Sequence, residues 1–348
     1  MYRPHIRRTI RLEPNVLNHL PEKILNLARG SLTRSADSTL QVIPLQKGGS
    51  DRRFFRVTAG EESLIIVSYT GHREENLHYV AIGEFLHAAG VQVPVVHYHD
   101  PAEGLIFMQD LGDVDLWAFR NADPGTRHTL YEAALLQAVQ LHGPASRAPG
   151  REHLHLQLEF DSQLYLWEQN YFFENCLGRF FGVESSTLDR MASLDALQAA
   201  ANELASLPRC LIHRDFQSQN IMVCHNTVWF IDFQGMRPGL PHYDIASLLF
   251  DPYASLLPEE RDRLVSFYLK AACREGIVEA DEARFRHTLN LCAMQRLMQA
   301  LGAYGFLGLE RGRPEFLEHI PGARRSLQGV LQRIEGTEDL RHTLEALN

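Results

Sequence analysis

The segment Leu211–Val223 reads LIHRDFQSQNIMV, and it decides the fold expected for this chain. One short apolar run leads into the polar stretch HRDFQSQN, and a second apolar run follows it. Short apolar runs beside polar turns predict β-strands. Asp215 and Asn220, five residues apart, are therefore expected on one tight loop between strands, where both side chains can converge on one ligand.

The spacing of Asp215 and Asn220 matches the pattern H-R-D-x-x-x-x-N. In that pattern the Asp orients an attacking hydroxyl and accepts its proton, and the Asn binds a metal ion. Phosphoryl transfer needs both functions. The alternative is a chance His-Arg-Asp triplet on a surface loop, and the flanking apolar runs disfavour it. We predict that Asp215 is catalytic and that Asn220 binds a metal.

A second carboxylate lies in VWFIDFQG, residues 228–235, after another apolar run. An Asp at the end of a strand usually caps a turn. Its position about a dozen residues after Asn220 instead favours the second Mg²⁺ ligand of a phosphotransferase. The sequence therefore predicts Asn220 and Asp232 as the metal-binding pair.

Three segments, HRDFQSQN, IDFQG and PHYDIASLL, together resemble the aminoglycoside phosphotransferase/choline kinase family. Within that family the chain is most similar to bacterial N-acetylmuramate/N-acetylglucosamine anomeric sugar kinases. The segments that carry this similarity are GGSDRRFFRV, EGLIFMQDLGD, DSQLYLWEQNYF and MQRLMQALGAYG. The resemblance extends roughly from Gly48 to Pro321.

The resemblance implies an α+β, two-lobed, protein-kinase-like fold. We expect a small antiparallel-sheet lobe, residues 1–111, that binds the nucleotide, and a larger helical lobe, residues 112–348, that binds the substrate. The residue patterns agree, because strand-like runs and one helix precede residue 111 and mostly helical periodicity follows it. The runs before residue 111 are 40–45, 54–58, 64–69, 75–89 (helical), 95–98 and 105–108.

When the functional residues of the family are matched to this sequence one by one, the resemblance implies that Asp215 is the catalytic base. The same matching implies that Asn220 and Asp232 hold Mg²⁺. It also implies that His213 supports the catalytic loop and that Asp244, in Y-D-I-A, braces it. A simple helix N-cap is the other role for Asp244, and the two roles are compatible.

Two segments are expected to bind ATP. Backbone amides at Gly48, Gly49 and Ser50 can approach phosphates, because glycines lack a side chain; a plain hairpin turn is the alternative. Gln109 and Leu111 lie where the two lobes should join, and there backbone groups would contact the adenine.

The strand LIIVSY departs from the kinase pattern, since no Lys stands near Ser68, where one would hold the α- and β-phosphates. This absence leaves open a pseudokinase-like, nucleotide-binding regulatory module. It also leaves the acidic helix partner of that Lys open among Glu74, Glu75 and Glu84.

Gln217, Gln234 and Arg296 are predicted to bind the acceptor. Two neutral amides beside the catalytic residues suit sugar hydroxyls, whereas aminoglycoside sites usually gather carboxylates around ammonium groups. The amides therefore favour a sugar over a polycation, and the resemblance implies that this sugar is an N-acetylated amino sugar phosphorylated at its anomeric hydroxyl. An aminoglycoside or amino-alcohol kinase is the alternative within enzymes.

Composition sets broad limits. With 348 residues, 45% hydrophobic and 22% charged, the chain has the profile of a soluble protein of two lobes. A net charge of −9 argues against nucleic-acid binding. The 5 cysteines form no C-x-x-C pair, and no apolar run is long enough to span a membrane. We expect a cytoplasmic enzyme that uses ATP and Mg²⁺ on a small-molecule substrate.

Overall fold

The computed structural model describes residues 21–32, 39–45, 52–254 and 256–347. By its internal contacts the chain divides into two compact units. The first comprises Met1–Val80 and Pro94–Asp110, and the second comprises Ala81–Val93 and Leu111–Asn348. Residues 81–93 thus belong with the second unit, and a lobe boundary at residue 111 stays a prediction.

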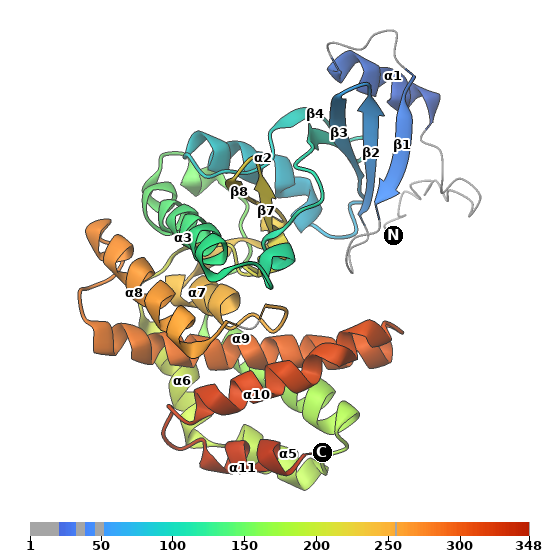
Figure 1. Ribbon diagram of the computed structural model, residues 1–348. Helices are drawn as coiled ribbons and strands as arrows, with labels where there is room; N and C mark the ends of the chain where they lie inside the picture. The colour runs from blue at the N-terminus through green and yellow to red at the C-terminus, as the bar shows by residue number, and fades with distance from the viewer. Residues whose placement is uncertain (1–20, 33–38, 46–51, 255, 348) are drawn as a thin grey trace, which may run out of the picture. The chain divides into compact units, whose positions relative to one another are not determined.

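The first unit contains a five-stranded antiparallel sheet in the order β1-β2-β3-β5-β4 (Figure 1). Alternate residues of β2 are buried, as the period of two along a strand requires. The predicted small antiparallel sheet is confirmed, with strand ends within two residues of those expected. The strands are β1 Gln41–Leu45, β2 Arg53–Ala59, β3 Glu62–Ser68, β4 Val96–Asp100 and β5 Leu105–Gln109.

Helix α1, Glu22–Ser31, covers one face of this sheet (Figure 1). Its buried Ala28 and the adjacent Leu32 belong to one apolar cluster with strand residues such as Val57, Ile66 and Phe107. Burial of these apolar side chains is the main stabilising contribution within the unit. Helix α2, Glu75–Ala88, follows β3 as the periodicity predicts.

The second unit is mainly helical, as expected, with two small strand pairs. The sequence predicts the β7–β8 hairpin, but it does not predict β9, whose Pro and Gly are poor strand formers. The strands are β6 Cys210–Ile212, β7 Ile221–Cys224, β8 Thr227–Phe230 and β9 Arg237–Gly239, paired as β6–β9 and β7–β8. The helices are α3 Pro124–Gln140, α4 Ser162–Phe172, α5 Ser185–Ala192, α6 Asp195–Ser206, α7 Pro241–Leu249, α8 Pro258–Arg274, α9 Glu282–Glu310, α10 Ile320–Leu331 and α11 Glu338–Ala346.

Helix α9 is the central element of this unit and packs against α4, α7 and α10 (Figure 1). Two glycines allow a close approach along it. A Cβ at Gly305 would lie 2.2 Å from the carbonyl oxygen of Asn175, and one at Gly302 would lie 2.9 Å from the Tyr171 backbone. This close contact places the middle of α9 beside the end of α4. Helices α4, α7 and α9 all contribute residues to the site below.

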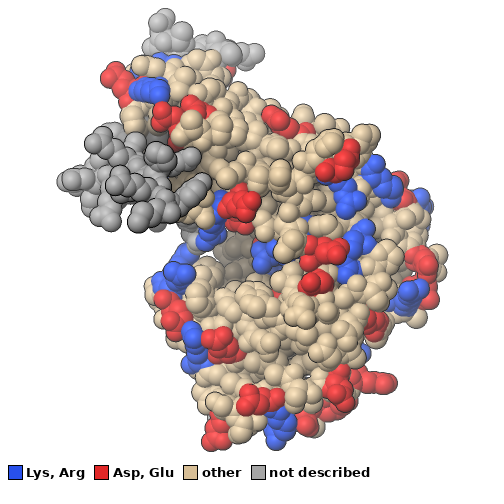
Figure 2. Space-filling model, turned by 180° about the vertical axis from the view of Figure 1, so that it is seen from behind, with Lys and Arg blue, Asp and Glu red and all other residues tan. Residues whose placement is uncertain are grey.

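No helix in the described ranges combines the length and the apolar character needed to cross a bilayer. On the face shown in Figure 2, acidic and basic side chains of the described residues are interspersed, without one broad basic patch. Absence of nucleic-acid binding stays a prediction.

Candidate active site

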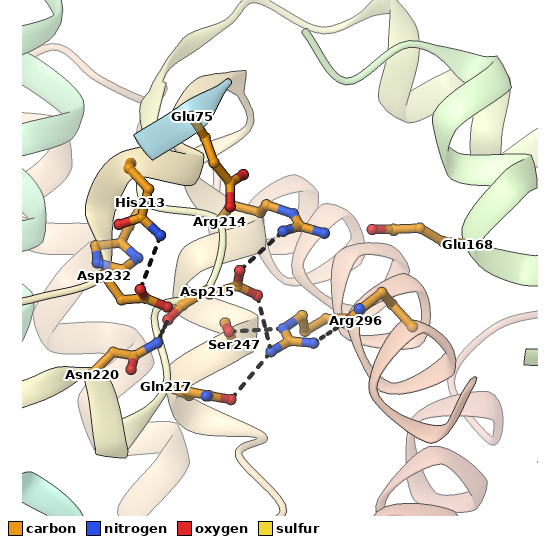
Figure 3. A network of polar contacts seen from close by, with 12 residues as sticks. Glu75, Glu168, His213, Arg214, Asp215, Gln217, Asn220, Asp232, Ser247 and Arg296 are labelled. Atoms are coloured by element: carbon orange, nitrogen blue, oxygen red, sulfur yellow. Dashed lines mark hydrogen bonds and ion pairs between the residues drawn. The ribbon is translucent and has the colours of Figure 1, made fainter. Parts of the chain in front are cut away.

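The segment HRDFQSQN forms a loop between the buried strand β6 and strand β7 (Figure 3). Arg214 has a φ of 76°, a conformation that is uncommon for a residue with a side chain. The carboxylate of Asp244, at the start of α7, accepts hydrogen bonds from the backbone amides of His213 (2.7 Å) and Arg214 (2.8 Å). These bonds satisfy two buried donors and hold the backbone in this unusual conformation.

Asp244 is completely buried and has a third partner, the Nε2 atom of His142 at 3.0 Å. The Nδ1 atom of His142 lies 2.7 Å from the hydroxyl of Tyr268. Nε2 of His213 lies 2.9 Å from the carbonyl oxygen of Ile231, which connects the loop to the segment after β8. The contacts of Asp244 and His213 are those that a supporting role requires.

The carboxylate of Asp215 is held between two arginines (Figure 3). Nη1 of Arg214 lies 3.0 Å from its Oδ2, and Nη2 of Arg296, from α9, lies 3.6 Å from its Oδ1. Burial by itself would raise the pKa of Asp215, but the charges of Arg214 and Arg296 outweigh it and lower that pKa. With its side chain still 31% exposed, Asp215 is an ionised carboxylate that an external hydroxyl can reach.

Arg296 connects several helices and loops at this point. Its Nε donates to the Ser247 hydroxyl at 2.9 Å, and its Nη2 donates to Oε1 of Gln217 at 3.4 Å. Two of the residues predicted to bind the acceptor therefore lie in contact with each other, beside Asp215. The third, Gln234, is buried and donates from Nε2 to Oδ1 of Asp232 at 2.9 Å.

Asn220 and Asp232, the predicted metal ligands, lie on neighbouring turns (Figure 3). Nδ2 of Asn220 donates to the carbonyl of Asp215 at 2.9 Å, so the orientation of its amide leaves the side-chain oxygen to act as a ligand. The amide of Ile231 donates to the carbonyl of Asn220 at 3.0 Å, which ties the two turns together. Asp232 has a left-handed backbone, with a φ of 64°.

The two side chains offer hard oxygen donors, an amide oxygen and a carboxylate. Within the described residues, no group of three or more His, Cys, Asp or Glu side chains is arranged to hold a metal by itself. Mg²⁺ is usually bound by one or two carboxylates together with water and substrate phosphates. Asn220 and Asp232 fit such a site when a nucleotide supplies the remaining oxygens.

Glu168, on α4, is a member of this cluster that the sequence did not single out. It is 1% exposed, its Oε1 accepts a 2.8 Å hydrogen bond from the Tyr243 hydroxyl, and its carboxyl group points toward Arg214 in Figure 3. Burial raises its pKa to about 7, against the opposing charge of Arg214. In the sequence, the feature that could have identified Glu168 is an acidic residue within a helix that is otherwise rich in aromatic residues.

The predicted nucleotide contacts are only partly described. Gly48, Gly49 and Ser50 lie outside the described residues. The backbone amide of Gln109 donates to the carbonyl of Val95 at 2.8 Å. Adenine binding by Gln109 and Leu111 stays a prediction.

Similar proteins include two enzymes named N-acetylmuramate/N-acetylglucosamine kinase. That of Pseudomonas aeruginosa is 29% identical over 314 residues, which cover 88% of each chain. That of Neisseria meningitidis is 24% identical, covering 81% of this chain and 83% of the other.

Among solved structures, an ADP-bound aminoglycoside phosphotransferase has a TM-score of 0.57 at 13% identity and covers 88% of this chain and 98% of its own. A choline/ethanolamine kinase family protein from Mesorhizobium loti has a TM-score of 0.59 at 17% identity, with coverages of 92% and 98%. These likenesses confirm the predicted protein-kinase-like fold. A model of the phosphotransferase enzyme family matches residues 41–288, which is most of the chain, and the chain therefore belongs to this family.

Proposed function

We propose that this phosphotransferase is an ATP- and Mg²⁺-dependent sugar kinase that phosphorylates the anomeric hydroxyl of an N-acetylated amino sugar. The observation that carries the proposal is the ionised, partly exposed carboxylate of Asp215 between Arg214 and Arg296, one turn away from Asn220. The names of the similar enzymes from Pseudomonas aeruginosa and Neisseria meningitidis support the choice of acceptor.

In the proposed mechanism, Asp215 orients the acceptor hydroxyl and accepts its proton as the hydroxyl oxygen bonds to the γ-phosphorus. The bond between the γ-phosphorus and the β,γ-bridging oxygen breaks in the same transfer, and ADP leaves. Arg214 and Arg296 fix the carboxylate from both sides, so that it meets the hydroxyl in one orientation. Asn220 and Asp232 would hold Mg²⁺, which when bound supplies charge neutralisation at the nucleotide phosphates. The bonds from Asp244 keep the loop in place throughout.

The charge around Asp215 also favours a sugar over a polycation. Arg214, Arg237 and Arg296 all lower the pKa of Asp215, so three guanidinium groups lie in its electrostatic surroundings. An aminoglycoside, which carries several ammonium groups, would be repelled by this charge. The aminoglycoside or amino-alcohol alternative is therefore the weaker of the two proposals.

The absence of a Lys on β3 remains a departure from other kinases. Ser68 ends the strand, and its cross-strand partner is Arg53. A nucleotide-binding module without catalysis would not need the arrangement around Asp215, and membership of a phosphotransferase family favours an enzyme.

The proposal is tested by ADP formation from ATP with Mg²⁺ over a panel of N-acetylglucosamine, N-acetylmuramic acid, glucose, choline and kanamycin. Phosphorus NMR of the product identifies the phosphorylated hydroxyl. We expect turnover of the two N-acetylated sugars and an anomeric phosphate. Turnover of choline or kanamycin alone would replace the proposed acceptor, and a product phosphorylated at another hydroxyl would contradict the anomeric assignment.

Arg296 is expected to control the pH dependence of the reaction. Its charge helps to lower the pKa of Asp215, so the carboxylate stays ionised as the pH falls. Arg296→Met should raise that pKa and move the acidic limb of the kcat/KM profile to higher pH. Arg324→Met is a matched control, because Arg324, on α10, lies over the Phe181 ring at 5.5 Å and does not contact Asp215. An acidic limb that stays in place would show that Arg296 does not act on Asp215.

A further inference from the structure

Arg237 lies next to the loop that carries Asp215. It begins β9 and pairs directly with Ile212 of β6, the residue before His213. Its guanidinium lies over the ring of Phe160, 5.2 Å from the centroid. Phe160 in turn packs against Tyr243 with ring centroids 4.6 Å apart. Strand pairing and aromatic packing therefore hold this positive charge at one place beside the site.

The guanidinium of Arg237 has no carboxylate partner among the residues that the structure describes. Its Nε atom is buried without a hydrogen-bond partner, and the whole residue is only partly exposed. Burial, followed by the charge of Arg214, lowers the pKa of Arg237. Partly burying an unpaired cation beside another cation costs free energy, and an anion from outside the chain would offset that cost.

The acidic groups nearby do not fully compensate this charge. Arg214, Arg237 and Arg296 all lower the pKa of both Asp215 and Glu168, so the five groups share one electrostatic neighbourhood. Asp215 already lies between Arg214 and Arg296. Glu168, with a pKa of about 7, is only partly ionised at neutral pH, and its Oε2 is buried without a partner. The cluster retains at least one uncompensated positive charge.

We propose that Arg237 is a specificity-determining residue that binds a carboxylate group on the acceptor sugar. The arrangement fits an acidic N-acetylated amino sugar, such as N-acetylmuramic acid, better than its neutral counterpart N-acetylglucosamine. A planar guanidinium pairs with a carboxylate through two parallel hydrogen bonds, which gives direction as well as affinity. The inference rests on the proposed function, because it refines the acceptor of the same site.

The test compares kcat/KM for three acceptors: N-acetylmuramic acid, its methyl ester and N-acetylglucosamine. The ester keeps the size of the acid but removes its charge. In the unchanged protein the acid should be preferred over both neutral acceptors. In Arg237→Met the value for the acid should fall about 10- to 100-fold, the range expected for hydrogen bonds to a charged group. The values for the ester and for N-acetylglucosamine should change less than about 3-fold, and KM for ATP should be unchanged.

Two further variants test whether a change in preference comes from the charge of Arg237. Arg237→Lys retains the charge and should retain part of the preference for the acid, even if the Met variant folds poorly. Arg324→Met removes another arginine that lies over an aromatic ring and has a buried Nε without a partner, and it should leave the preference unchanged.

The possible outcomes separate the two proposals. Equal losses for all three acceptors, or a rise in KM for ATP alone, would overturn the role of Arg237 and leave the sugar kinase intact. If only KM for ATP rises, the anion that Arg237 binds would be a phosphate of the nucleotide. An unchanged protein that prefers the neutral sugars would also overturn it. Absence of turnover on every sugar would overturn the proposed function and, with it, this inference.

Discussion

Replacing Asp215 with Asn should lower kcat by about 100- to 10,000-fold, the range that general-base catalysis contributes. Asn keeps the shape of the side chain but removes the proton acceptor and the charge that Arg214 and Arg296 contact at 3.0 and 3.6 Å. The measurement is steady-state ADP formation with the acceptor that the panel identifies. KM for ATP should change little, because Asp215 is proposed to act on the acceptor hydroxyl.

Asp123→Asn is the matched control for this substitution. Asp123 caps α3 by accepting a hydrogen bond from the amide of Thr126 at 3.0 Å, and Asn can make the same bond. Asp123→Asn should keep its activity and unfold at nearly the same temperature as the unchanged protein. If Asp215→Asn kept more than about a tenth of the activity, Asp215 could not be a general base that raises the reaction rate at least about 100-fold.

Replacing Asp244 with Ala should have the largest effect on stability, about 3–5 kcal/mol, which is typical when one partner of a buried charged network is removed. The substitution would leave the amides of His213 and Arg214 and the ring of His142 without their acceptor in a fully buried place. The urea midpoint should fall accordingly. Because the same bonds hold the catalytic loop, kcat should also fall under conditions in which the variant is folded.

Asp244→Asn and Asp161→Ala test whether the loss of stability in Asp244→Ala comes from the lost buried hydrogen bonds. Asn retains one acceptor oxygen and should destabilise the protein less than Ala does. Asp161 is an exposed cap that accepts from the amide of Leu164 at 2.8 Å, and its loss should cost only about 1 kcal/mol. A loss for Asp244→Ala no larger than that for Asp161→Ala would mean that the buried network contributes little.

The strands and helices were largely predictable, because their signals are local. The apolar run at 64–69 is strand β3, Glu62–Ser68, and the periodicity over 75–89 is helix α2, Glu75–Ala88. Where prediction failed, the local signal was weak. Strand β9 is three residues long and contains Pro238 and Gly239, so only its pairing with β6 makes it a strand.

The sequence by itself determined the order of the proposed catalytic groups. Asp215, Asn220 and Asp232 lie within 18 residues, and a short chain segment allows few ways to place them. Their spacing along the chain is therefore enough to predict the proposed chemistry.

Only the tertiary structure decided what surrounds Asp215. Arg296 comes from α9, Glu168 from α4 and Arg237 from β9, and no spacing along the chain predicts that they share one neighbourhood. The close packing of α9 on the segment after Tyr171, which Gly302 and Gly305 permit, brings α9 and α4 together. Charges interact through space and not along the sequence, so the pKa shifts of Asp215 and Glu168, and the unpaired charge of Arg237, follow only from the packed fold.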